Sequence, residues 1–235
     1  EQMINILCFL GLAEQQKVAP TAAEVDAQYD NFKLVQDAAN IKPFEDRLAE
    51  NGLTPQDFKD LQIRPQLAEV KLLNKGKAAP TDAEVKAFYD QHKADQFTKP
   101  SRAHIKVIVL SSQSDADQIS KQIQGGQNFD TFVPRSLNKA FVNGEFPQWV
   151  SLDDTKNVQL EPLIDSVKKT AVGKTTPPFA FQGGYWLVEV LEKKDKEVVP
   201  FDQVKSLIPY AILEERVLPQ KDDTPAVQQQ KFQAL

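Results

Sequence analysis

The 235-residue chain is poor in the residue types on which metal centres and disulfide frameworks depend. It has one cysteine, Cys8, and two histidines, His92 and His104. A single cysteine excludes an intramolecular disulfide and a cysteine-based zinc site, and two histidines argue against a histidine-rich metal centre. We therefore expect neither a metal nor another cofactor. Cys8 lies in an apolar stretch, where we expect it to pack rather than react.

Long apolar runs are also missing. No run reaches the roughly 18 apolar residues that span a bilayer. The nearest candidate, residues 3–10, is short, contains Asn5 and has no basic residue before it, so it does not resemble a signal peptide. The chain opens at Glu1, and we expect that any targeting segment or lipid anchor is absent from it.

An excess of positive charge is the third absence. With 28 basic and 33 acidic residues the formal net charge is −5, which excludes a broadly basic nucleic-acid binder. Hydrophobic residues make up 41% of the chain, enough for a buried core. The length fits one large domain or two modest ones.

Helix signals dominate the first hundred residues. Thr21 with Glu24 three positions later is a capping box, which begins a helix. A second helix is predicted over 41–51, and a long third helix begins at Thr54. Residues 19–33 recur at 79–93 with ten of fifteen positions identical. Two copies are too few for a solenoid, so we interpret them as a helix-start sequence used twice.

The pattern changes after Pro100. The residues 104–110 are β-branched and partly alternate, which predicts a strand. The elements expected next are a helix from Ser114 to Gly125, a short helix at 129–136, a turn and short strand at 144–150, a helix at 161–169 and a hairpin of 176–181 with 185–191. The segment is therefore predicted to run β-α-α-β-α-β-β. His92, before it, is expected to be a solvated helix residue.

One amphipathic helix is predicted beyond this segment, over 201–213, and the polar tail from Gln220 is expected to fray. A lone helix cannot bury its apolar face, so we expect it to pack on the N-terminal helices. The prediction is an α+β fold in which a discontinuous all-helical domain, 1–99 plus 199–235, holds an inserted β-α-α-β-α-β-β domain at 100–198.

The inserted segment resembles a parvulin-type (PpiC-like) peptidyl-prolyl isomerase domain, also called a rotamase. The strand opens with Arg102-Ala103-His104-Ile105, as in that family. The motifs that follow in family order are Gly125-Gly126-Gln127-Asn128-Phe129, Asn143-Gly144-Glu145-Phe146, Thr176-Pro177-Pro178-Phe179 and Gly184-Tyr185-Trp186. Upstream, the capped helices and 44–73 resemble the helical chaperone domain of SurA- and PrsA-like foldases.

The resemblance implies a site in which two histidines and a Cys or Asp surround the bound proline. His104 matches the first histidine, whereas the Cys/Asp position falls on Asn138 and the second histidine on Trp186, so two of the three depart from the family pattern. We take these three as catalytic candidates. The apolar proline cup carries over to Phe146, Val158 or Leu160, Leu163 and Phe181.

Prolyl isomerisation needs no covalent step, because the barrier of about 18–20 kcal/mol comes from amide conjugation. A catalyst holds the ring and favours the twisted amide. His104 is either a member of that pocket or a strand residue that only anchors the fold. Trp186 either lines a peptide groove or belongs to the sheet core. If the strands 104–110 and 185–191 lie side by side as in the family, we expect His104 near Trp186.

Two functions compete. The first is an extracytoplasmic foldase and chaperone that binds unfolded, proline-containing polypeptides and has isomerase activity weakened by the replaced residues. The alternative is a holdase chaperone whose parvulin unit binds peptide without turnover. The resemblance implies a location in the periplasm or at the cell surface, membrane attachment only through an N-terminal anchor outside this chain, and a homodimer where helical segments exchange between chains.

Overall fold

The computed structural model describes residues 2–154, 157–218, 224 and 226–229, and side chains from Phe9 onward. These residues form two compact units, each described here by itself. One is made by the described residues up to 36, from 43 to 98 and from 198 onward, and the other by 37–42 with 99–197. Most of the tail expected to fray from Gln220 lies outside the described residues.

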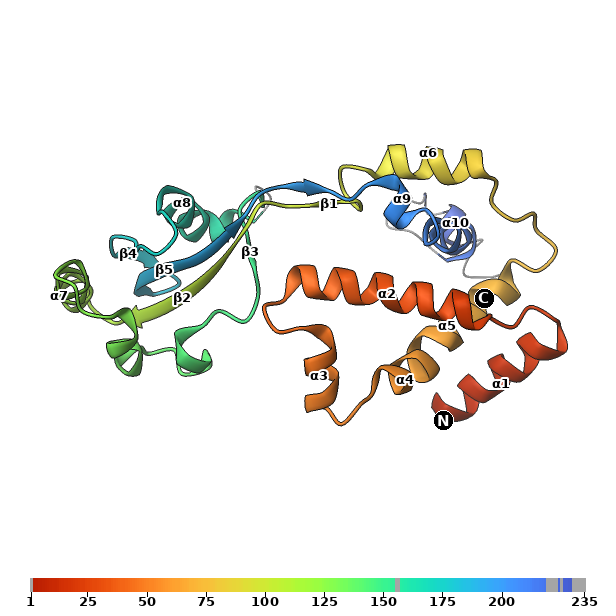
Figure 1. Ribbon diagram of the computed structural model, residues 1–235, viewed down its shortest axis with the longest axis horizontal. Coiled ribbons are helices and arrows are strands. Elements are labelled where there is room, and N and C mark those ends of the chain that lie inside the picture. Colours follow the sequence, from red (N-terminus) through yellow and green to blue (C-terminus); the bar gives the residue numbers. More distant parts are fainter. Residues whose placement is uncertain (1, 155–156, 219–223, 225, 230–235) are drawn as a thin grey trace. The chain divides into compact units, whose positions relative to one another are not determined.

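The first unit is helical (Figure 1). Its elements are α1 (Gln2–Gln15), α2 (Ala22–Ala39), α3 (Phe44–Glu50), α4 (Pro55–Phe58), the π-helical turn η1 (Lys59–Ile63), α5 (Arg64–Leu73), α6 (Asp82–His92), α9 (Phe201–Val204) and α10 (Ile208–Val217). Among the described residues, no helix is long and apolar enough to cross a membrane.

The C-terminal helices pack on an N-terminal helix, as predicted. Val85, Phe88 and Tyr89 of α6 form a buried cluster with Val204 and Ile208. The hydroxyl of Tyr89 donates a 2.7 Å hydrogen bond to the carbonyl of Val199. The helical unit is therefore discontinuous in sequence.

In both copies of the repeated helix start, a cation from another helix binds the capping glutamate. Lys71 on α5 binds the Glu24 carboxylate at 2.8 Å and reaches the carbonyl of Ala19 at 3.5 Å. Arg216 on α10 binds Glu84 at 2.9 Å and the carbonyl of Ala78 at 2.8 Å. Each cation thus ties a capping glutamate and the chain before it to a second helix.

Two predicted helices are interrupted by proline. The helix expected from Thr54 contains the π-helical turn η1 just before Pro65, because Pro65 has no N–H to donate to the carbonyl of Leu61. The helix expected over 201–213 is split into α9 and α10, and α10 has Pro209 in its first turn. His92 is not solvated as predicted, because its ring stacks on Phe88 at 4.4 Å and its side chain is only 19% exposed.

The second unit is built on an antiparallel sheet with strand order β3-β2-β5-β4. Its elements are β2 (Arg102–Leu110), α7 (Gln113–Gln124), the 3-10 turns η2 (Phe129–Thr131), η3 (Val133–Arg135) and η4 (Val142–Gly144), β3 (Val150–Ser151), the 3-10 turn η5 (Val158–Leu160), α8 (Glu161–Lys169), β4 (Phe179–Phe181) and β5 (Gly184–Lys194). The short strands β1 (Thr98–Lys99) and β6 (Glu197–Val198) form a separate two-stranded sheet.

The long strands β2 and β5 are neighbours, as the sequence predicts, and each face of their sheet carries a helix. On one face, Ile164 and Val167 of α8 pack on Ile105 and Val188. On the other, Ile119 of α7 packs against the cluster that contains Ile108, Leu110 and Leu187. Figure 1 shows α8 beside β4 and β5. The α+β fold with a parvulin-like order of elements is confirmed.

Candidate functional site

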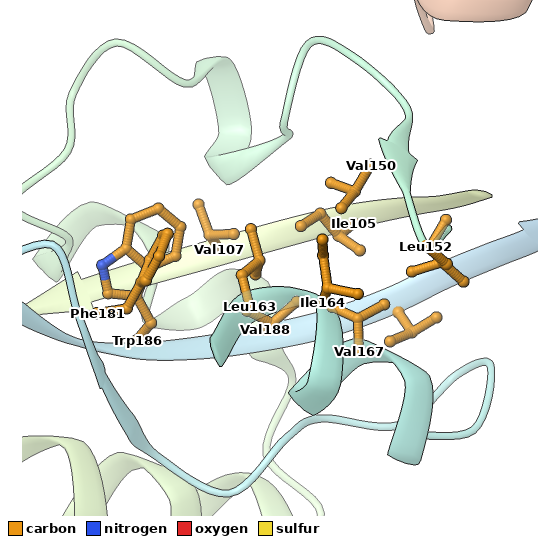
Figure 2. Packing of buried hydrophobic residues seen from close by; sticks show 12 residues of the cluster. Ile105, Val107, Val150, Leu152, Leu163, Ile164, Val167, Phe181, Trp186 and Val188 are labelled. Carbon is orange, nitrogen blue, oxygen red and sulfur yellow. The ribbon is translucent and has the colours of Figure 1, made fainter. Parts of the chain in front are cut away.

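The face of the sheet covered by α8 brings together most of the residues predicted to bind proline. It holds a buried hydrophobic cluster in which Nε1 of Trp186 is the only polar side-chain atom (Figure 2): Ala103, Ile105, Val107, Val150, Leu152, Leu163, Ile164, Val167, Phe181, Trp186, Val188 and Val190. Phe146 and Leu160 pack against them and are half-buried. We call Phe146, Leu160, Leu163, Phe181 and Trp186 the Trp186 cluster.

Trp186 occupies the position at which the family has its second histidine. On β5 it lies opposite Val109 of β2 on one side and Phe179 of β4 on the other. Its ring meets that of Phe181 edge-on, with ring centroids 4.8 Å apart and an interplanar angle of 81°. The side chain is 5% exposed, and its Nε1 has no hydrogen-bond partner.

A half-buried rim surrounds this core. Phe141 and Phe179 belong to it together with Phe146 and Leu160, and the rings of Phe141 and Phe146 have centroids 5.0 Å apart. Neither residue was predicted as a contact: Phe141 lies outside the family motifs, and Phe179 lies inside one, where strand alternation places it on the same face as Phe181. Val158, a predicted contact, is 73% exposed and does not belong to the buried cluster.

The loop that carries Phe146 is fixed tightly to the edge of β2. Phe146 donates a 3.0 Å backbone hydrogen bond to the carbonyl of Ile105. Gly144 has a φ of +74°, and a Cβ there would lie 3.0 Å from the carbonyl oxygen of Val107. Only glycine combines that backbone conformation with such a close approach, so Gly144 determines where Phe146 lies.

The expectation that His104 lies near Trp186 is wrong. His104 is opposite Glu192, beyond a register shift in the β2–β5 pairing. Its neighbours Ala103 and Ile105 both face α8, so strand alternation directs His104 to the other face. The family motif gives the order of residues along the strand, whereas the facing pairs depend on cross-strand register.

His104 instead anchors the loop from the opposite face. Its Nε2 lies 2.6 Å from Oε1 of Glu145, although the ring N–H is not aligned for a hydrogen bond, so the contact is ionic in character when the ring is protonated. Its ring is also 5.8 Å from that of Trp149, over which the Lys194 ammonium lies at 4.3 Å. Of the two readings of His104, the geometry supports the fold anchor.

The same face carries Lys106 and Glu189, whereas Lys193 of β5 reaches the carbonyls of Lys168 and Thr170 at the end of α8. Lys106 lies opposite Glu189 and forms a 2.6 Å ion pair with Asp130. Burial raises the pKa of Glu189, against the opposing charge of Lys106. The charged network and the Trp186 cluster therefore lie on opposite sides of one sheet.

Asn138 turns its side chain to its own loop. Its Oδ1 accepts a 3.0 Å hydrogen bond from the backbone N–H of Ala140, which is an Asx turn. The preceding residues contact the strand instead. Ser136 Oγ accepts from the Val109 N–H at 3.0 Å, and the Leu137 N–H donates to the Val109 carbonyl at 2.8 Å. Ser136, missed by sequence analysis, thus joins this segment to the residue opposite Trp186.

The helical unit has a separate small cavity of about 90 Å³ between α2, α5 and α10. Ala27, Leu67 and Leu213 are apolar lining residues, and Glu24 and Lys71 are charged ones. Burial by itself would raise the pKa of Glu24, but hydrogen bonds from Lys71 and Thr21 lower it on balance. Within the described part of the chain, no group of three His, Cys, Asp or Glu side chains is arranged to hold a metal ion.

Comparison with known proteins gives consistent matches. The family profile described as a PPIC-type PPIase domain matches residues 80–206. The foldase protein PrsA of Clostridium acetobutylicum is 22% identical over 215 residues, covering 90% of this chain and 64% of that protein. The periplasmic chaperone PpiD of Haemophilus ducreyi is 25% identical over 139 residues, 59% of this chain and 22% of that protein.

A solved structure from work on PEB4 and Cj1289, two structurally related SurA-like chaperones of Campylobacter jejuni, is also similar. It is 25% identical with a TM-score of 0.50, and the match covers 88% of this chain and 79% of that one. The chain therefore matches this solved structure over most of its length, but spans slightly less than two thirds of the PrsA relative.

Proposed function

The chain belongs to the family of PPIC-type PPIase domains, and on that basis we propose that it is an extracytoplasmic foldase and chaperone that binds unfolded polypeptides and isomerises Xaa-Pro bonds slowly. The relatives named above include a foldase and a periplasmic chaperone. The observation that carries the proposal is the Trp186 cluster, to which the loop at Phe146, the segment at 160–163, β4 and β5 all contribute.

We propose that a proline-containing segment binds over the Trp186 cluster, with the half-buried rim as its contact surface. Three apolar side chains close in sequence to the rim residues are exposed: Leu137 is 60% exposed, Val142 77% and Val158 73%. Burying such surface is favourable by roughly 25 cal/mol per Å². Ordering a flexible peptide offsets much of that gain, so we expect weak binding.

Slow isomerisation follows from what the cluster lacks. Of the three catalytic candidates only Trp186 is in the cluster, while His104 faces the other side of the sheet and Asn138 caps its own loop. No ionisable side chain therefore takes part in the cluster to polarise the hydrogen-bond network around the proline. We propose His104 as a positioning residue for the Phe146 loop, not as a catalytic one.

The helical unit is proposed as a second contact surface for clients. Several of its large apolar side chains are more than a third exposed: Phe9, Leu12, Phe32, Leu34, Val35, Leu53 and Leu61. Two weak contacts on one client combine through effective concentration. We propose the limits 1–99 with 199–235 for this chaperone domain and 100–198 for the parvulin-like domain.

An isomerase assay on a panel of proline tetrapeptides tests the proposal. Wild type is expected to accelerate isomerisation slightly above the uncatalysed rate. The double variant Trp186→His/Asn138→Asp is expected to gain little, because His104 remains on the other face. No acceleration with any peptide would remove the isomerase part.

The holdase is the second candidate, favoured by the absence of ionisable groups from the Trp186 cluster. This candidate requires that the protein suppress the aggregation of an unfolded client and that it show no isomerisation above the uncatalysed rate. Loss of both activities would overturn the chaperone proposal as well. Localisation is tested separately, by fractionation of cells expressing the natural full-length protein.

A further inference from the structure

The Trp186 cluster contains one polar side-chain atom, and that atom has no partner. Phe146, Leu160, Leu163 and Phe181 are hydrocarbon side chains, so Nε1 of Trp186 is the only nitrogen or oxygen among them. The side chain that carries it is 95% buried, since 5% is exposed, and Nε1 makes no hydrogen bond. Figure 2 shows the indole nitrogen turned away from Leu163, with the ring of Phe181 beside it.

A buried donor without an acceptor is costly, and native proteins rarely retain one. A phenylalanine would be aromatic and apolar without that cost. An indole N–H is a donor only, so the group that would satisfy it is an acceptor supplied from outside the chain.

The side chains of the Trp186 cluster offer one hydrogen-bond donor and no acceptor, which suits one kind of peptide bond. An ordinary secondary amide has a carbonyl acceptor and an N–H donor, and its N–H would find no acceptor among these side chains. The amide before proline is tertiary and has a carbonyl oxygen but no N–H. It therefore needs one donor and no acceptor, and its ring is apolar, which is what the cluster offers.

We propose that the indole N–H of Trp186 donates a hydrogen bond to the carbonyl oxygen that precedes proline in a bound polypeptide, so that the Trp186 cluster selects tertiary over secondary amides. This inference rests on the proposed function, since it assigns the recognition chemistry of the same site. Because Nε1 is buried, a half-buried rim side chain such as Phe179, which lies opposite Trp186 on β4, has to turn aside as the peptide binds.

The hydrogen bond acts on binding and opposes turnover. A donor on the carbonyl oxygen strengthens the conjugation that makes the C–N bond partly double. The twisted transition state has lost that conjugation, so the bond stabilises the planar ground state more. Trp186 thus lowers KM without raising kcat, in keeping with a site better suited to holding Xaa-Pro segments than to isomerising them.

The indole proton itself is the test, because the chain has only two tryptophans. In ¹H–¹⁵N spectra of the full chain, the Trp149→Phe variant assigns the two indole signals. On titration with acetyl-Ala-Ala-Phe-Pro-Ala-Ala-amide, the Trp186 indole proton is expected to shift downfield. The same peptide with alanine in place of proline is expected to bind more weakly. A peptide with N-methylalanine there should bind nearly as well as the proline peptide, because it keeps the tertiary amide.

Affinity and kinetics of Trp186→Phe supply the second measurement. Loss of one neutral hydrogen bond is expected to weaken proline-peptide binding about three- to tenfold, to leave alanine-peptide binding unchanged, and to raise KM without lowering kcat. Trp149→Phe is the matched control and should keep wild-type affinity.

The outcomes separate the two proposals. Peptide-induced shifts around Leu163 with a silent Trp186 indole, or equal affinity for the proline and alanine peptides, would overturn the assignment of Trp186 and leave the proposed function standing. No shifts anywhere in residues 99–197 at saturating peptide would overturn both the assignment of Trp186 and the isomerase part of the proposed function.

Discussion

Trp186 and His104 lie on opposite faces of the same antiparallel strand pair, Trp186 opposite Val109 and His104 opposite Glu192. The residue that the family pattern makes catalytic is thereby separated from the proposed peptide surface by the sheet itself. It still touches Glu145, which precedes Phe146 in the chain. Its influence on the site is therefore indirect.

His104→Ala is expected to lower stability and leave catalysis nearly intact. The variant removes the contact with Glu145 and the packing on Trp149, and we expect the free energy of unfolding to fall by about 1–2 kcal/mol. Urea unfolding measures this, with kcat determined on folded protein. Glu145→Gln is the companion variant, because it weakens the same contact from the other side. A large fall in kcat with unchanged stability would restore His104 to a catalytic role.

Leu163→Ala tests whether the Trp186 cluster is a packed core. Leu163 is 1% exposed, so its truncation should leave a cavity and lower the free energy of unfolding by about 2–5 kcal/mol. Val158→Ala is the matched control: Val158 is 73% exposed, and its truncation should change stability by less than about 0.5 kcal/mol. Similar losses in both variants would contradict the packing.

Gly144→Ala and Gly173→Ala form a second matched pair, because both glycines have a φ of +74°. A Cβ at Gly144 would meet the Val107 carbonyl at 3.0 Å, whereas nothing lies within 4 Å at Gly173. Both variants carry the backbone strain, of order 1 kcal/mol. Only Gly144→Ala is expected to weaken peptide binding, since it displaces Phe146. Equal affinities in the two variants would show that the loop position does not matter.

The helical unit should lose stability in acid through Glu24. Its pKa is lowered in the folded protein from an ordinary value of 4.5, so the carboxylate stabilises the fold above that pH, and the contribution disappears as pH falls through the folded pKa. Helix content followed by circular dichroism during melts at pH 7 and pH 3 measures this. In Glu24→Gln the difference between the two melting temperatures should shrink.

Glu84→Gln is the parallel variant for that experiment, since the second helix start repeats the first. Hydrogen bonds from Thr81 lower the pKa of Glu84 as well, and its side chain is 49% exposed, close to the 43% of Glu24. Solvent screens both ion pairs to a similar extent, so Glu84→Gln is expected to change the acid response in the same direction and by a comparable amount. An acid response in Glu24→Gln that matches wild type would refute the role given to Glu24.

Sequence patterns predicted local structure well wherever caps and periodicity determine it. The helix expected over 161–169 is α8, Glu161–Lys169, and the strands at 104–110 and 185–191 pair as expected. Phe146, Leu160, Leu163 and Phe181 lie in or against one buried cluster. Strand alternation accounts only for Phe181, because the other three residues come from a loop, a 3-10 turn and a helix.

What sequence patterns could not supply is register. Strand β2 begins at Arg102, and the pairing with β5 shifts between His104 and Ile105. These features decide which residue of β2 lies opposite Trp186, and neither has a local signature. The chemistry of proline predicts that Pro65 and Pro209 interrupt their helices. It does not predict that one interruption is a π-helical turn and the other a break, because that depends on packing.

The split of the helical unit bears on the order in which a newly made chain can fold. The hydroxyl of Tyr89 on α6 donates its hydrogen bond to the carbonyl of Val199, 110 positions later in the chain. The ion-pair partner of Glu84, Arg216, is synthesised later still. As domains tend to fold from the N-terminus during synthesis, the sheet strands β2 and β5 are complete before α10 is made. The nascent helical unit thus keeps the α6 face of Val85, Phe88 and Tyr89 uncovered while about a hundred residues are added at 5–20 per second. A protein proposed to shelter unfinished chains would, for several seconds of its own synthesis, be one of them.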